Sequence, residues 1–170
     1  MWQDEIVEKI KNLISAIAAD QSLSKEDRLY VQNFVIECCL SFPKYVVATN
    51  EYVFVVHSIS ESRANGDISQ DEFERRLKNV DISRRNFHNK AIDSCNQLNR
   101  QCEKYGLDKI CHIDTQNRSA VADFAANFAM AIHGYALDHN YTMDEVVQKM
   151  EKDPRMLTGK IVVENSVIER

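Results

Sequence analysis

The segment between Gln70 and Gly106 contains no glycine or proline and keeps one apolar stripe over its whole length. Spacings of three, four and seven residues in that stripe are those of one face of an α-helix. Ser69 and Glu72 have the spacing of a capping box at its start, and Gly106 is a typical C-terminal stop. The pattern therefore predicts one very long helix over residues 70–105. Its stripe comprises Phe73, Leu77, Val80, Phe87, Ala91, Cys95, Leu98, Cys102 and Tyr105.

The rest of the chain has a similar helical character. Apolar periodicity predicts helices over about 4–19, 24–42 and 119–137, with a short one over 142–150. Pro43 is expected to end the second of these helices or to begin the next. With only 4 Gly and 2 Pro in 170 residues, the chain is too poor in turn residues for an all-β fold. We expect an all-α fold, a single-domain antiparallel bundle of five to six helices with a long central helix.

Hydroxyl side chains predict where three of the other helices begin. Ser24 precedes Lys25-Glu26-Asp27, whose acids suit the first turn of a helix. Ser119 is the expected N-cap of the Ala-rich helix, and Thr142 with Glu145 forms a second capping box.

In two segments, a β-strand is an alternative to the helical or irregular structure that we expect. Residues 44–64 include Tyr52–Val56, whose β-branched and aromatic residues are typical of a buried strand. The same segment also has apolar residues at helical spacing, and the chain offers little for a strand to pair with, so we favour a helix. The other strand-like run is Lys160–Glu164, within residues 155–170, which lack a helical period. This end of the chain is expected to be an irregular tail, or to add a short C-terminal strand.

Charge and hydropathy limit the class of partner. The chain has 21 Lys and Arg against 26 Asp and Glu, a net charge of -5. Its densest basic clusters, Arg75–Lys78 and Arg84-Arg85, are interleaved with acids, so we expect no nucleic-acid partner. No run approaches the ~18 apolar residues of a membrane-spanning helix, and the first residues do not resemble a signal peptide. A cytoplasmic protein with no membrane partner is expected.

The five cysteines form no C-x-x-C pair, so neither a zinc knuckle nor a dithiol redox site is indicated. We interpret them as small buried hydrophobic residues in a reducing compartment. Cys111-His112 is the one adjacent pair in which a base could activate a thiol, although adjacency alone does not place the base on the sulfur. The cysteines are Cys38, Cys39, Cys95, Cys102 and Cys111.

Residues 61–73 resemble the calcium loop of an EF-hand. Asn65, Gly66 and Glu72 stand at the ligand, turn and bidentate positions of that loop. Arg63, however, puts a cation where a carboxylate ligand should lie. Two helices joined by a glycine turn and a capping box have the same residues at these positions. We therefore expect a capped helix hairpin and no metal site.

The long helix carries the richest polar constellation of the chain. Arg84 falls inside the apolar stripe, with Asp81 and His88 along its edge. Polar groups so close to a core must be hydrogen-bonded or open to a cleft. We therefore expect Arg84 to face a carboxylate, either Asp81 or one from a neighbouring helix (Glu37, Glu51 or Asp123). The candidate ligand-binding residues are Asp81, Arg84, His88, Asn96 and Asn99.

The run Arg84-Arg85-x-x-His88-Asn89-x-x-Ile92-x-x-x-Asn96-x-x-Asn99-Arg100, followed by Tyr105-Gly106, resembles the central helix of a small bacterial family of domains of unknown function. The resemblance covers about residues 45–135. It implies an all-helical domain and carries no assigned activity, so no catalytic residue is transferred.

Two functions are compatible with these observations. The first is a non-catalytic structural or protein-interaction module that self-associates or binds a protein partner, since Trp2, Val53 and Phe54 are apolar beyond the main stripes. The alternative is a small-ligand-binding or enzymatic bundle with a pocket around Asp81 and Arg84 and His88. No catalytic spacing, phosphate-binding loop or cofactor motif is present in the sequence, so no cofactor is expected. A cleft that opens onto these residues favours the second function, and a closed network favours the first.

Overall fold

The computed structural model describes residues 2–138 together with Glu145 and Gln148. In this part of the chain, every element of regular secondary structure is a helix. The helices are α1 (Trp2–Ala18), α2 (Lys25–Ala64), α3 (Gln70–Lys104) and α4 (Arg118–Asp138). The prediction of an all-α fold with a long central helix is confirmed. Four helices are described where five to six were expected. The helix expected over 142–150 and the strand expected at Lys160–Glu164 lie outside the residues whose fold is described.

Residues 44–64 are helical, as favoured, but the predicted break at Pro43 is wrong. Helix α2 continues through this proline for 40 residues. Proline in a helix interior removes one backbone hydrogen bond and costs about 3 kcal/mol. Here Phe42 and Tyr45, on either side of it, are buried with 0% and 4% of their surface exposed. Their packing holds the backbone helical, because tertiary contacts outweigh the local preference.

Of the four predicted caps, Thr142 lies outside the described residues, and two of the other three are confirmed. The hydroxyls of Ser24 and Ser69 accept hydrogen bonds from the backbone N–H groups of Asp27 and Glu72, both at 3.1 Å. Ser119 is not the cap of α4. That helix begins one residue earlier, and the side-chain oxygen of Asn117 accepts from the N–H of Ala120 at 3.2 Å. Asparagine caps a helix at least as well as serine, so the earlier start is satisfied locally.

Gly66 and Gly106 end α2 and α3 in the left-handed backbone region, with φ of 77° and 64°. At each end the residue after the glycine donates to the carbonyl five residues back, Asp67 to Ser62 and Leu107 to Cys102, both at 2.9 Å. This is the Schellman arrangement, which satisfies the last carbonyls of a helix.

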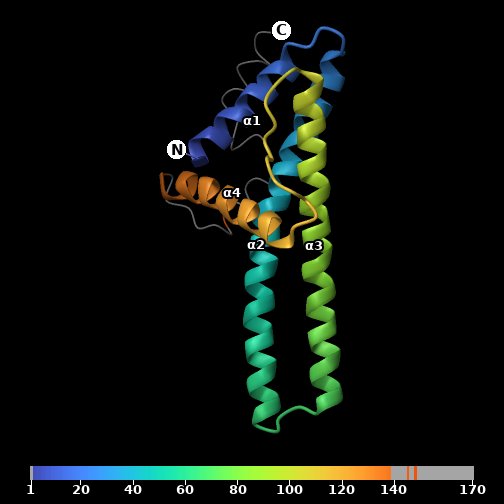
Figure 1. Ribbon diagram of the computed structural model, residues 1–170, viewed down its shortest axis with the longest axis vertical. Helices are drawn as coiled ribbons and strands as arrows, with labels where there is room; N and C mark the ends of the chain where they lie inside the picture. The colour runs from blue at the N-terminus through green and yellow to red at the C-terminus, as the bar shows by residue number, and fades with distance from the viewer. Residues whose placement is uncertain (1, 139–144, 146–147, 149–170) are drawn as a thin grey trace.

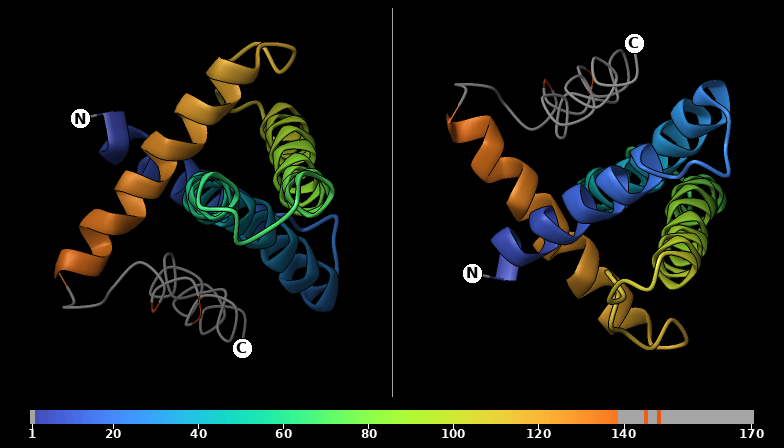
Figure 2. Two further views of the ribbon diagram at one scale, coloured as in Figure 1. Left: turned by 90° about the horizontal axis from the view of Figure 1, so that it is seen from below. Right: turned by 90° about the horizontal axis from the view of Figure 1, so that it is seen from above.

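Helices α2 and α3 form a long antiparallel hairpin (Figure 1). Helix α1 lies beside the first half of α2, and α4 crosses α1 and α2 at a steep angle (Figure 2). The residues after α3 run back along that helix before α4 begins. The hairpin extends well beyond α1 and α4, and we call residues 50–64 with 70–84 the arm. Only the near end of the arm, at Arg84, approaches the start of α4.

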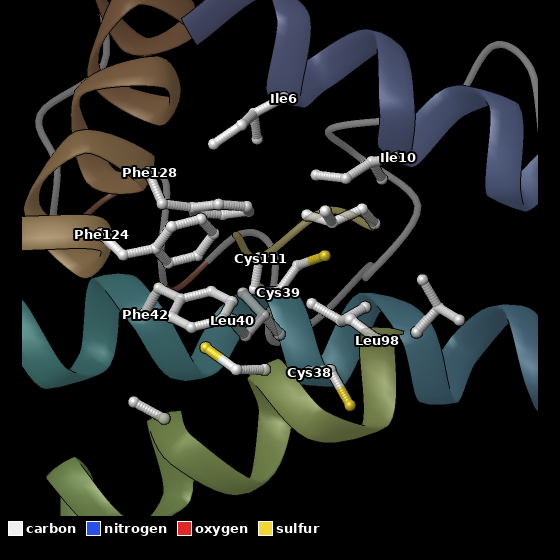
Figure 3. Packing of buried hydrophobic residues seen from close by; sticks show 14 of the residues in the cluster. Ile6, Ile10, Cys38, Cys39, Leu40, Phe42, Leu98, Cys111, Phe124 and Phe128 are labelled. Carbon is white, nitrogen blue, oxygen red and sulfur yellow. The ribbon is translucent and has the colours of Figure 1, made fainter. Parts of the chain in front are cut away.

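The core lies at the end of the molecule where the four helices meet. Phe42 of α2 packs against Phe124 and Phe128 of α4, with ring centroids 5.0 and 4.9 Å apart (Figure 3). Ile6 and Ile10 of α1 close the same cluster. All five cysteines are free thiols buried in or beside it, which confirms that they act as small hydrophobic residues.

Candidate functional site

A polar pocket of about 300 Å³ opens between α3 and the segment that leads into α4. Three arginines and a histidine contribute to its wall, and no carboxylate is among the lining residues. The lining consists of Arg84, Arg85, His88, Asn89, Ile92, Thr115, Gln116 and Arg118. The pocket therefore joins part of the polar constellation of the long helix to residues more than twenty positions later in the chain.

Asp81 holds two of these arginines beside the pocket. Its carboxylate accepts from Arg84 at 2.8 Å and from Arg85 at 2.9 Å. The hydrogen bond from Arg84 is the main cause that lowers the pKa of Asp81. Of the four carboxylates that the sequence offered as partners of Arg84, Asp81 is therefore the one that pairs with it. The two side chains are 23% and 25% exposed, so the pair lies at the edge of the pocket and not in a closed interior.

Arg84 is further oriented by an aromatic ring from α2. Its guanidinium carbon lies 5.1 Å from the ring centroid of Tyr52, within the range of a cation–π interaction. Together with the bond to Asp81, this contact fixes the guanidinium in one place. A positioned arginine loses less conformational entropy when it binds a ligand.

His88 forms the buried side of the pocket. Its Nδ1 lies 2.8 Å from the hydroxyl oxygen of Tyr45, and 8% of its surface is exposed. Burial lowers the pKa of His88 below 6.5, and the charges of Arg118 and Arg84 lower it further. Both effects favour the neutral imidazole. With Nδ1 engaged by Tyr45, Nε2 is the ring nitrogen left for a ligand.

Arg118 brings a third positive charge from the first turn of α4. The guanidinium lines the pocket together with the polar residues of α3, and its charge lowers the pKa of both Asp81 and His88. The first backbone bond of this helix runs from Val121 to Asn117, so the N–H groups of Arg118 and Ser119 precede the hydrogen-bonded turns. Such N–H groups carry the positive end of the helix dipole.

Asn96 and Asn99, the other two sequence candidates, do not line the pocket. The side chain of Asn99 donates to the carbonyl of Cys111 at 2.9 Å and accepts from its N–H at 3.0 Å. It therefore anchors the segment between α3 and α4, which supplies Thr115 and Gln116 to the pocket. Asn96 is exposed to solvent.

Sequence reasoning missed the residues that reach the pocket from outside the long helix, above all Arg118. Residues 107–118 read as a loop, and a loop carries no periodicity that would place its side chains. One signal was present. A cation in the first turn of a helix opposes the dipole, so an arginine at that position indicates a compensating role.

In the segment that resembles an EF-hand, Glu72 and Arg63 form hydrogen bonds with other side chains of the protein. The carboxylate of Glu72 accepts from Arg75 at 2.6 and 2.9 Å and from Arg76 at 2.7 Å, and these bonds lower its pKa to about 2. Arg63 donates to Gln70 and lies over the ring of Phe73. Within the described ranges, no group of three or more His, Cys, Asp or Glu side chains is placed to hold a metal ion.

Cys111 does not have the properties of a reactive thiol. It is 2% exposed, and its pKa is raised by a hydrogen bond with Cys95 and by burial. The adjacent His112 is exposed to solvent. A thiolate nucleophile needs the opposite environment, with a lowered pKa and access to solvent.

Comparisons with known proteins give no match: no family model, no curated protein and no solved structure is similar to this chain. Among the described helices, none has the length and apolar character needed to cross a membrane.

Proposed function

We propose that this protein is a non-catalytic ligand-binding protein that holds a small anion in the pocket between α3 and α4. The observation that carries the proposal is the convergence of Arg84, Arg85 and Arg118 on one pocket whose lining residues include no carboxylate, while Asp81 at its edge pairs with two of the three arginines. A pocket with this excess of positive charge attracts an anion and excludes a cation. An opening onto Arg84 and His88 is also what favours ligand binding over a closed structural network.

The same residues argue for binding and against catalysis. Arginine stays protonated at any physiological pH, so the three guanidiniums can hold charge but cannot transfer a proton. His88 is the one lining side chain with a titration near neutral pH, and no carboxylate, thiol or second histidine stands beside it in the lining. General acid–base catalysis needs a positioned proton donor or acceptor on the reacting group. The proposal includes no cofactor and no metal.

Calorimetry and thermal shift with a panel of anions test this function. The panel contains inorganic phosphate, sulfate, malonate and acetate, each at constant ionic strength. Arg118→Gln should weaken the binding of the preferred anion at least tenfold, because it removes a guanidinium from the wall of the pocket. Arg100→Gln changes an exposed arginine on the same helix as Arg84 and should leave binding unchanged. If no anion stabilises the wild-type protein, or if both variants respond alike, the proposal is wrong.

A second candidate function is self-association through the arm. Phe54 and Val53 of α2 are 74% and 61% exposed, and Ile82 of α3 is 46% exposed. These residues lie where the hairpin has no third helix against it, and exposed apolar surface of this kind is typical of interaction sites. A second copy of the chain that pairs its arm with the first would cover them.

Analytical ultracentrifugation over a range of concentrations tests the second candidate. Phe54→Glu should convert a dimer into a monomer, because it places a charge in the apolar contact. Tyr30→Glu is the matched control, since Tyr30 is 73% exposed on the same helix but lies outside the arm. A wild-type protein that stays monomeric at all concentrations would exclude self-association.

The wider setting of the protein is also part of the proposal. Five buried free thiols are compatible with a reducing compartment, which supports a cytoplasmic location. We further propose that residues 1–170 form one domain related to the bacterial family that its central helix resembles, with no nucleic-acid or membrane partner.

A further inference from the structure

We infer that the anion is a phosphate monoester whose substituent is aliphatic and hydroxylated, such as a sugar or polyol phosphate. This inference rests on the proposed function and specifies the class of ligand that the same pocket takes. It follows from the charge of the pocket, from the donors at its mouth, from its size and from the chemistry of the rest of its lining.

The charge of the site matches a dianion. Arg84, Arg85 and Arg118 contribute three positive charges, and Asp81 offsets one of them. The net excess of two equals the charge of a phosphate monoester, which carries about -1.5 to -2 at pH 7. A ligand with only one carboxylate group would leave one guanidinium of the site without a counter-charge.

The donors at the pocket also suit a phosphate group. Two of the arginines come from α3 and the third from the first turn of α4, so they approach from separate elements. Arg118 also stands in the first turn of α4, where the positive end of the helix dipole adds to its own charge and favours an anion such as phosphate. A phosphate offers three terminal oxygens to such a divided set of donors, whereas a carboxylate offers two.

The pocket is larger than a bare phosphate. Its volume of about 300 Å³ lies at the lower end of the range of small-molecule sites in proteins. Inorganic phosphate would fill only part of this space. The remainder is available to a substituent on the ester oxygen.

The other lining residues indicate what that substituent is. Asn89, Thr115 and Gln116 offer amide and hydroxyl groups, which are hydrogen-bond partners for hydroxyl groups of a ligand. Ile92 is the single apolar side chain among the lining residues, and none of them is aromatic except the neutral imidazole of His88. An aromatic or nucleobase substituent would lack the stacking surface on which such rings usually bind.

Calorimetric titration with four probes tests the class of ligand. The probes are glucose 6-phosphate, phenyl phosphate, malonate and glucose, at pH 7.5 and constant ionic strength. Glucose 6-phosphate should bind at least tenfold more tightly than phenyl phosphate or malonate, which corresponds to about 1.4 kcal/mol. Glucose alone should not bind measurably, because it lacks the dianion.

Two variants separate recognition of the phosphate from recognition of the substituent. Arg118→Gln should weaken glucose 6-phosphate and inorganic phosphate alike, by at least tenfold. Gln116→Ala should weaken glucose 6-phosphate several-fold and leave inorganic phosphate unchanged. Both residues are exposed, so circular dichroism melts are expected to match the wild type and to exclude unfolding as the cause.

The outcomes distinguish failure of this inference from failure of the proposed function. If malonate binds through Arg118 and the phosphate esters do not, the pocket is an anion site but not a phosphate site. If phenyl phosphate binds as tightly as glucose 6-phosphate, the hydroxylated substituent is wrong. If none of the anions binds, the proposed function fails together with the inference.

Discussion

The Nδ1 atom of His88 on α3 lies 2.8 Å from the hydroxyl oxygen of Tyr45 on α2. The two rings meet edge to face with their centroids 5.2 Å apart, and both side chains are buried. This contact joins the two long helices directly behind the pocket. The position of His88 in the pocket, and the charge it can carry there, therefore depend on a residue 43 positions earlier in the chain.

Replacement of Tyr45 by phenylalanine should destabilise the protein. It removes the hydroxyl and leaves Nδ1 of a buried imidazole without its partner, which typically costs about 1–2 kcal/mol. Tyr30→Phe is the control, because Tyr30 is 73% exposed and water replaces any bond its hydroxyl makes. Urea unfolding measures both free energies. Equal losses in the two variants would mean that the His88–Tyr45 bond contributes nothing.

His88 should also make stability depend on pH. Burial first, and then Arg118 and Arg84, lower its pKa in the folded protein below the value of 6.5 in the unfolded chain. As the pH falls through 6.5, the unfolded chain takes up the proton first, so the free energy of unfolding falls. The loss continues until the lower pKa of the folded state is reached. Above about pH 7.5 the group has no effect.

Urea unfolding at pH 7.5 and pH 5.5 checks this dependence. The wild type should lose more stability between the two values than His88→Gln, which carries no titrating group at that position. Arg118→Gln should give an intermediate loss, because it removes one of the charges that lower the pKa. Asp20 and Glu72 do not contribute to this difference. Their pKa values are about 2 in the folded protein, so they change the free energy of unfolding below pH 5.5. A loss of the same size in wild type and His88→Gln would contradict the assignment.

The sequence was most informative where structure is decided by neighbours along the chain. Helix α3 follows its prediction closely because Ser69 and Gly106 mark its ends within a single turn. The pair of Asp81 and Arg84 was also accessible, since residues three apart lie on the same face of a helix. Pro43 was misread because the local preference of proline says nothing of the core that packs around Phe42.

The candidate site was predicted only in part for a related reason. Helical angle places Asn99 near His88 on one edge of α3, but the two residues are eleven positions apart, which is about 16 Å along the axis. Asn99 therefore meets Cys111, and His88 meets Tyr45. Arg118 enters the pocket through the tertiary path of the chain after α3, which no periodic pattern records.

Asn99→Ala should loosen the segment between α3 and α4. The substitution removes both bonds to the backbone of Cys111, and each such bond contributes about 1 kcal/mol. Local opening that exposes the Cys111 thiol should become at least fivefold more frequent, since about 1 kcal/mol is a factor of about five. Labelling with a thiol reagent, followed by peptide mapping, measures this rate.

Asn96→Ala serves as the control for that experiment. Asn96 lies three residues earlier on the same helix, and its side chain is exposed to solvent. It takes no part in the two bonds between Asn99 and Cys111. Its labelling rate should equal that of the wild type. If Asn96→Ala accelerates labelling of Cys111 as much as Asn99→Ala does, the two bonds do not anchor the segment.

Arg84→Ala separates the roles of Arg84 in folding and in binding. A buried ion pair that loses one member typically costs 3–5 kcal/mol, because the other charge is stranded. Asp81 is not stranded here, since Arg85 still donates to it at 2.9 Å and a quarter of its side chain is exposed. We therefore expect Arg84→Ala to lower the free energy of unfolding by no more than about 1 kcal/mol, the upper end for exposed pairs.

Anion affinity should respond to the two members of this pair in opposite directions. Arg84→Ala removes a positive charge from the pocket and should weaken the binding of inorganic phosphate. Asp81→Asn removes the offsetting negative charge and should strengthen it, provided that the variant remains folded in a circular dichroism melt. A structural pair with no part in binding would leave both affinities unchanged. A stability loss of 3 kcal/mol or more in Arg84→Ala, with phosphate affinity unaltered, would show that this arginine belongs to a closed network and not to a ligand site.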